Sequence, residues 1–133
     1  MIATARGERS LSTAIYFLLS AGTFSAWHRI QSDELWHFYC GSSAIEVLAI
    51  DAEGTLTRTL LGNPLRDAAA VCQHTVPAKT WFASRVVGDT GMALVGCTVA
   101  FGFSFLDFEL AERDKLTALY PQHGAVIAEL TRQ

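Results

Sequence analysis

The segment from Gly22 to Gly41, GTFSAWHRIQSDELWHFYCG, concentrates side chains that could do chemistry. It holds two of the four histidines, two of the three tryptophans and an adjacent Asp–Glu pair. An imidazole and a carboxylate that converge can hold a metal ion or act as base and acid. This segment is therefore the first place to look for a functional site.

The spacing predicts how these side chains are aimed if two strands are joined by the turn at 31–33. Successive side chains of a strand point to opposite faces, so His28 and Ile30 share one face of the first strand. Glu34 opens the second strand and can point to the same face across the turn. Residues at period two after Glu34 would line the same interior: Trp36 and Phe38.

Other residues have a structural interpretation beside the functional one. His28 is equally well explained as a buried, hydrogen-bonded imidazole. Glu34 is costly to bury unless it is paired, and Arg29 or His28 could be its partner. His37 and Tyr39 are expected on the opposite face of their strand, at the surface or in a dimer interface, unless a bulge intervenes. Arg85 and Asp107 are weaker candidates for polar groups of the pocket.

The elements that position these residues are predicted from a dominant period of two, with turn residues every 8–12 positions. Eight short strands fit a double-sheet jelly roll, also called a double-stranded β-helix. The expected strands are Thr13–Ser20, Phe24–Ile30, Glu34–Cys40, Ala44–Ile50, Leu56–Leu61, Val71–Val76, Trp81–Val87 and Ala93–Val99. The fold class is therefore all-β.

The C-terminal third changes to helical spacing from Leu110 onward. Leu116, Leu119 and Tyr120 share one helical face, and Pro121 separates or opens a second piece. We expect one or two short helices that close one side of the barrel. The chain of 133 residues and 14.5 kDa is expected to be a single domain, 1–133.

Composition excludes several classes of protein. Half the residues are hydrophobic and 17% are charged, which excludes a disordered chain. The net charge of −3, with no basic block, argues against nucleic acid as a partner. The apolar segment 12–22 could pass for a signal peptide, but its strand formers favour a buried strand, and it is too short to span a bilayer.

The cysteines and the missing motifs narrow the chemistry further. The three cysteines, Cys40, Cys72 and Cys97, are scattered and odd in number, which favours a reducing cytoplasm over a disulfide framework. Cys97, within an apolar strand, is expected to be inert packing. The sequence contains no phosphate loop, dinucleotide fingerprint, nucleophile elbow or H-E-x-x-H motif.

Two stretches of the chain resemble motifs of the cupin superfamily. Gly22, His28, Glu34 and Gly41 are spaced as in the first cupin motif, G-x5-H-x-H-x3,4-E-x6-G, and Pro77 aligns with the second, G-x5-P-x-G-x2-H-x3-N. More narrowly, four segments are similar to the cupin-5 family, long catalogued as a domain of unknown function: STAIYFLL, WHRIQSDELWHFYCG, VPAKTW and LVGCTVAFGFSFLDFEL. The resemblance covers residues 9–130 and implies a cupin-type barrel.

The sequence departs from the cupin pattern where a metal would bind. Cupin metal sites use two histidines and a glutamate of the first motif and a histidine of the second. The resemblance maps these positions to His28, Ile30, Glu34 and Phe82, of which two are apolar. We therefore expect no bound metal and no cofactor, with Phe82 as part of an apolar wall. The segment before residue 13 is expected to be shorter than is usual in the family, and Phe101 stands where the family commonly has proline.

Three functions remain open at this stage. The first is a small-molecule-binding cupin of unassigned activity, with its ligand near His28 and Glu34. The second is a metal-independent enzyme similar to sugar-nucleotide epimerases or isomerases, with His28 and Glu34 as catalytic candidates. A metal-dependent dioxygenase or isomerase is third, because two of the four ligands are missing.

The expected partners are a small polar metabolite and a second copy of the chain. Small cupins commonly form homodimers through sheet edges, and the aromatic-rich strands expose more apolar surface than one thin barrel easily buries. No nucleic acid and no membrane is expected as a partner, and the predicted location is cytoplasmic.

Overall fold

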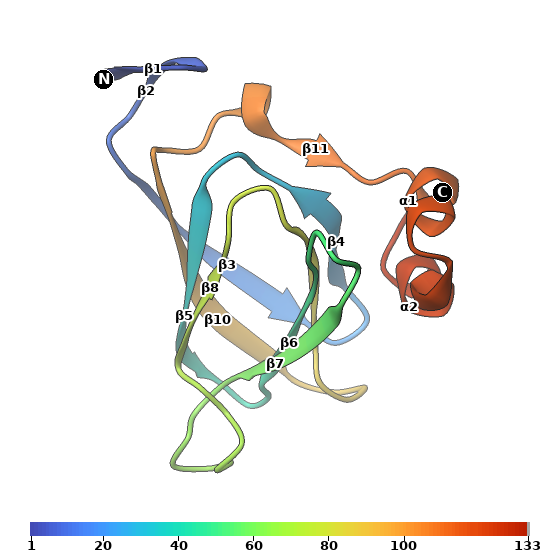
Figure 1. Cartoon of the computed structure of the whole chain (residues 1–133). Coiled ribbons are helices and arrows are strands. Elements are labelled where there is room, and N and C mark those ends of the chain that lie inside the picture. The colour runs from blue at the N-terminus through green and yellow to red at the C-terminus, as the bar shows by residue number, and fades with distance from the viewer. Residues whose placement is uncertain (133) are drawn as a thin grey trace.

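The computed structural model describes residues 1–132 and is built mainly of antiparallel strands, with short helices toward the C-terminus (Figure 1). The strands are β1 (Ile2–Thr4), β2 (Gly7–Arg9), β3 (Thr13–Ser20), β4 (Phe24–Arg29), β5 (Asp33–Gly41), β6 (Ile45–Ile50), β7 (Leu56–Leu61), β8 (Gln73–Val76), β9 (Trp81–Val86), β10 (Met92–Ala100) and β11 (Glu109–Leu110). The helical turns are η1 (Phe105–Asp107), α1 (Arg113–Leu119), η2 (Pro121–His123) and α2 (Gly124–Glu129). The predicted all-β class with short C-terminal helices is confirmed.

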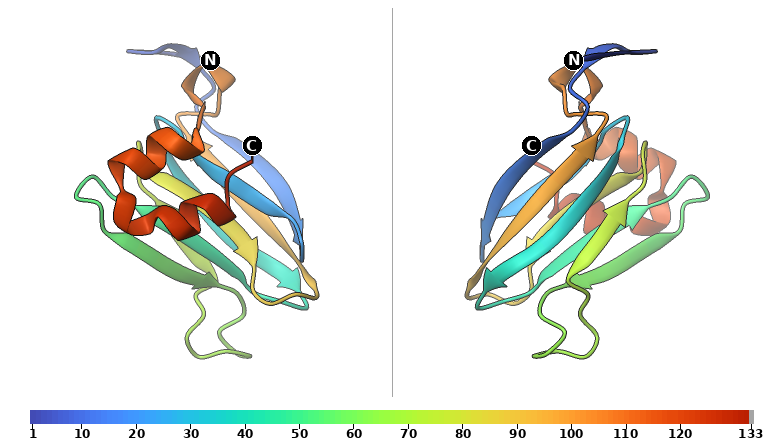
Figure 2. Two further views of the ribbon diagram at one scale, coloured as in Figure 1. Left: turned by 90° about the vertical axis from the view of Figure 1, so that its right-hand side faces the viewer. Right: turned by 90° about the vertical axis from the view of Figure 1, so that its left-hand side faces the viewer.

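Two sheets pack face to face to form the barrel. One sheet has the strand order β3-β10-β5-β8, and the other has the order β11-β4-β9-β6-β7. The pairs of named strands within both sheets are antiparallel. The β1–β2 hairpin forms a small sheet of its own beyond one end of the barrel (Figure 2).

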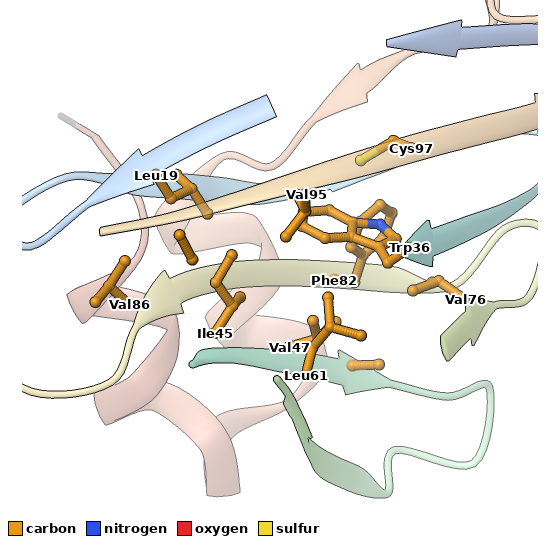
Figure 3. Close-up of a cluster of buried hydrophobic side chains, with 12 residues drawn as sticks. Leu19, Trp36, Ile45, Val47, Leu61, Val76, Phe82, Val86, Val95 and Cys97 are labelled. Atoms are coloured by element: carbon orange, nitrogen blue, oxygen red, sulfur yellow. The ribbon is translucent and has the colours of Figure 1, made fainter. Parts of the chain in front are cut away.

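The space between the sheets is filled by the inward side chains that the period of two predicts. Trp36 of β5 and Phe82 of β9 meet edge to face, with ring centroids 6.2 Å apart. Val95 and Cys97 of β10 close the cluster from above in Figure 3. Burial of each large apolar side chain contributes roughly 1.5–3 kcal/mol, so this cluster is a main source of stability.

The two α-helices cover the outer face of the five-stranded sheet (Figure 2). Trp27 on β4 points outward into this second cluster, where its indole Nε1 donates to the carbonyl of Val126 at 3.2 Å. Leu116 and Ile127 of the helices pack in the same cluster. None of the helices in residues 1–132 has the length and apolar character that a bilayer crossing requires.

A buried ion pair joins the N-terminal hairpin to the η1 segment. Arg9 of β2 donates from Nε and Nη2 to the two carboxylate oxygens of Asp107, at 2.9 and 2.8 Å. The hydrogen bonds from Arg9 hold the pKa of Asp107 below its usual value. Asp107 is thus a structural residue rather than a polar group of the pocket, and it anchors the η1 segment that borders the site.

Candidate functional site

A cavity of about 610 Å³ opens between β3, β4, β5 and β10, below the segment that leads into η1. Its polar lining includes His28 and Glu34, which the sequence predicted to converge, together with Trp36. The rest of its wall is mostly apolar and aromatic: Ile15, Phe17, Cys97, Val99, Phe103 and Phe105. A cavity of this size and character suits a small organic molecule.

A bulge in β4 aims His28 into the cavity. Ser25 is the register partner of Ser84, and His28 is the partner of Phe82, so three steps on β4 oppose two on β9. The extra residue lets Ser25 and His28 line the same cavity although their spacing is odd. The bulge falls at Ala26 and Trp27, and it also leaves Trp27 facing the helices.

His28 is held as a neutral imidazole. Its Nδ1 lies 2.7 Å from the carbonyl oxygen of Ala26, and because that oxygen can only accept, Nδ1 must carry the proton. Burial lowers the pKa of His28. The ring packs against Phe82 and Phe108, with centroid distances of 4.2 and 5.3 Å. Its Nε2 is therefore an unprotonated acceptor, and no hydrogen bond reaches it within residues 1–132.

Glu34 is a buried carboxylate without a cationic partner in the described part of the chain. Its residue is 8% exposed, and its Oε2 accepts a 2.7 Å hydrogen bond from Nε1 of Trp36. Burial raises the pKa of Glu34 to about 7, against the opposing effect of the Trp36 hydrogen bond. From the sequence, Arg29 and His28 were the two candidate partners of Glu34. Arg29 instead pairs with Glu109 at 2.6 Å.

His28 and Glu34 border one cavity without contacting each other. Among the described residues neither a hydrogen bond nor an ion pair joins them. Within residues 1–132 each has one atom that no hydrogen bond reaches, Nε2 of His28 and Oε1 of Glu34. A ligand between them could meet a hydrogen-bond acceptor on one side and a carboxyl group on the other.

The donor set does not fit the metal site that cupins use. Residues 1–132 contain no cluster of three or more His, Cys, Asp or Glu side chains that could hold an ion. Ile30 and Phe82, at two of the four ligand positions, are buried apolar residues. Cys97 lines the cavity, but burial raises its thiol pKa strongly, which disfavours the thiolate that metals need.

Two predicted site residues lie away from the cavity surface. The ring of Phe82 contacts that of His28 at an interplanar angle of 50° and supports it rather than lining the cavity. Phe38 points inward like Glu34 and Trp36, but it lies four positions further along β5, about 13 Å from Glu34. It lines a different cavity, of about 350 Å³, with Gly41 and Asn63.

Sequence reasoning missed the part of the wall that comes from β3, β10 and the η1 segment. Ile15 and Phe17 follow the same period of two that was used for β5, so a signal was present. The period of two could not predict which strands pair. In the sheet, β10 lies between β3 and β5. Arg85 is also outside the site, in ion pairs with Glu46 and Glu129.

Comparisons with known proteins place the chain among cupins. A family model described as Cupin_5, Cupin superfamily (DUF985), matches residues 2–111. The structure is similar to protein SO0799 from Shewanella oneidensis, with 43% identity and a TM-score of 0.86, over 93% of this chain and 77% of that one. It is also similar to a hypothetical protein from Leishmania major, with 31% identity and a TM-score of 0.88, over 99% and 83% of the two chains.

More distant similarity shows the fold alone. A dTDP sugar isomerase from Desulfovibrio desulfuricans shares 19% identity and a TM-score of 0.67, over 94% of this chain and 78% of the isomerase. No curated protein matches the sequence.

Proposed function

The chain belongs to the Cupin_5 family of the cupin superfamily, and from this premise we propose that it binds a small organic molecule in the cavity lined by His28 and Glu34. The ligand would place one polar group between Nε2 of His28 and Oε1 of Glu34. Its apolar body would lie against Trp36 and the phenylalanines of the wall.

One observation carries this proposal: a cavity of about 610 Å³ joins a predominantly apolar wall to two polar atoms that have no hydrogen-bond partner within residues 1–132. Burying a carboxylate without a cationic partner is costly, and the Trp36 hydrogen bond reaches only one of the oxygens of Glu34, so a further donor to this group would be favourable. A bound ligand supplies that donor. The apolar Ile30 and Phe82 at two of the cupin ligand positions favour an organic ligand over a metal ion.

A metal-independent epimerase or isomerase of the sugar-nucleotide type is the second candidate. Its support is the pair of titratable groups: neutral His28 could accept a proton next to a carbonyl, and Glu34, with its pKa near 7, could donate one. It ranks second because the cavity lining contains no Lys or Arg among the described residues, and a diphosphate needs positive charge.

We also propose that a second copy of the chain covers the outer face of the β3-β10-β5-β8 sheet. Tyr16 and Leu18 of the edge strand β3 are 79% and 59% exposed. Tyr39 lies over Gly96, where any Cβ would clash with its ring, and reaches Tyr16 with ring centroids 5.8 Å apart. An exposed apolar edge strand is otherwise prone to aggregation. The cytoplasmic location remains a prediction.

Native mass spectrometry tests the binding function directly. Wild-type protein and the Val99→Phe variant, which places a ring in the cavity, would be incubated with a metabolite extract and desalted. We expect wild type to retain a small organic molecule and the variant to lose it, with matching circular dichroism spectra. Equal retention by both proteins, or by neither, would contradict the proposal.

The enzymatic alternative has a separate test. Turnover of dTDP-sugars would be measured as a function of pH for wild type, His28→Ala and Glu34→Gln. A pH-dependent turnover that both substitutions abolish would favour the enzymatic function over a binding function alone. Absence of turnover with binding intact would exclude this substrate class.

A further inference from the structure

Glu34 is the single acidic or basic side chain, apart from the neutral His28, in the lining of the cavity within the described residues. No Lys, Arg or second carboxylate borders the cavity there. Val99 and Val76, its partners across the two neighbouring strands, are apolar. The cavity therefore presents an unbalanced negative site to anything that enters it.

The free oxygen of this carboxylate faces the cavity. Oε2 is engaged by the indole of Trp36 at 2.7 Å, whereas no hydrogen bond reaches Oε1 within residues 1–132. Within residues 1–132, Ser84 Oγ is the one fully enclosed side-chain atom that lacks a hydrogen-bond partner. Oε1 of Glu34 also lacks a partner there, so it is not fully enclosed. A ligand group that donates hydrogen bonds can thus reach Oε1.

Aromatic rings surround the same space. The ring centroids of Phe17 and Trp36 lie 5.9 Å apart, and the rings of Phe103 and Phe105, which also line the cavity, meet edge to face with their centroids 5.0 Å apart. Ring faces attract organic cations, and the attraction grows when water is excluded. A carboxylate among aromatic rings is a favourable environment for an ammonium group that carries an apolar body.

We propose that the ligand is a small organic amine, whose ammonium group binds the Glu34 carboxylate and whose apolar or aromatic body lies among Phe17, Trp36, Phe103 and Phe105. This inference rests on the proposed function and narrows it to one chemical class. An ammonium group supplies the positive charge that the buried Glu34 carboxylate lacks. Nε2 of His28 accepts a second hydrogen bond from the ligand.

The charge argument separates this class from its competitors. A carboxylate or phosphate ligand would face Glu34 with no cation to compensate. A neutral alcohol could still bond to Oε1, but without the charge-assisted hydrogen bond, which is about twice as strong as a neutral one. We therefore expect the amine to bind at least tenfold more tightly than an alcohol of the same shape.

Three probes of nearly equal shape test this order: 2-phenylethylamine, 2-phenylethanol and phenylacetate. Their affinities for wild type would be measured by calorimetry at pH 8. We expect the amine to bind most tightly, the alcohol at least tenfold more weakly and phenylacetate not at all. Equal or tighter binding of the alcohol or of phenylacetate would overturn the inference, and so would failure of all three at millimolar concentration.

Two variants locate the effect at the carboxylate. Glu34→Gln keeps an oxygen for Trp36 and removes the charge, so the amine should lose its advantage while the alcohol binds as before. Glu53→Gln removes an exposed carboxylate in the β6–β7 turn and should leave all three affinities unchanged. An advantage for the amine that survives Glu34→Gln would contradict the inference. If Glu34→Gln fails to fold, the comparison on wild type still decides.

This test fails differently from the test of the binding function. If 2-phenylethanol or phenylacetate binds wild type as tightly as the amine or more tightly, and does not bind Val99→Phe, the amine class is refuted and the cavity remains a binding site. A chain that retains no metabolite in native mass spectrometry would refute the binding function itself.

Discussion

The indole Nε1 of Trp36 donates a 2.7 Å hydrogen bond to Oε2 of Glu34, two residues earlier on β5. Because side chains alternate along a strand, residues at this spacing share a face, and the bond forms inside the barrel. The bond gives Oε2 of the buried carboxylate a donor and leaves Oε1 available to the cavity. The carboxylate is thereby positioned without being neutralised.

The burial of Glu34 predicts that its removal stabilises the protein at high pH. The pKa of Glu34 is raised to about 7 in the folded chain from 4.5 in the unfolded one, so folding favours the protonated form. The stability that this group contributes is complete below pH 4.5 and is lost as the pH rises through 7. The shift corresponds to about 3 kcal/mol as an upper value.

At pH 8 the free energy of unfolding of Glu34→Gln should therefore exceed that of wild type by up to about 3 kcal/mol, and the variant should unfold at a higher denaturant concentration. At pH 4.5 the two proteins should unfold at nearly the same concentration. His28 and His74, whose pKa values burial lowers, are common to both proteins, and their contributions cancel in this difference. Glu53→Gln is the matched control and should show no pH-dependent difference. A difference that is constant between pH 4.5 and pH 8 would refute the assignment.

The support of His28 by Phe82 predicts a large loss of stability when that ring is removed. Phe82 is 1% exposed and packs against both His28 and Trp36. Phe82→Ala should lower the free energy of unfolding by about 3–5 kcal/mol. Phe105→Ala removes the same ring from a position that is 81% exposed and should cost less than about 0.5 kcal/mol. Equal costs for the two variants would show that Phe82 is not a core residue.

From the exposed apolar side chains on the outer face of the β3-β10-β5-β8 sheet we predict a dimer in solution. Light scattering at micromolar concentration should give twice the mass of one 14.5 kDa chain. Leu18→Glu, in the middle of the exposed apolar face, should give a monomer. Leu65→Glu, at a loop position that is 94% exposed, should leave the dimer intact. A monomeric wild type would contradict the prediction, and so would dissociation by both variants.

The strands could be predicted closely because an apolar interior imposes a period of two. The expected bounds Thr13–Ser20 and Leu56–Leu61 are those of β3 and β7. The strands β1, β2 and β11 were missed, since segments of two or three residues carry no measurable period. β1 and β2 form by pairing with each other, and β11 forms because β4 offers it a partner, with Glu109 opposite Arg29.

The site could be predicted only in part. The turn between β4 and β5 is local, so the spacing predicted that His28 and Glu34 face one interior, although it did not predict the bulge that precedes His28. The distance of Phe38 along the strand, the Trp36 hydrogen bond and the wall contributed by Phe17 depend on which strands pair. Strand pairing at long range is not encoded in any single segment, and the resemblance to cupins supplied the topology without the side-chain contacts.

The most direct test of a ligand cavity beside Trp36 is the indole ¹H–¹⁵N spectrum of the three tryptophans during titration with 2-phenylethylamine and 2-phenylethanol. Trp36 lines the cavity, whereas Trp27 and Trp81 lie in the other cluster, under the helices, and serve as internal controls. Trp36→Phe assigns the Trp36 signal. We predict that at least one probe shifts the Trp36 resonance saturably and leaves that of Trp27 in place. A Trp36 resonance that neither probe moves, or a shift confined to Trp27 and Trp81, would contradict the account.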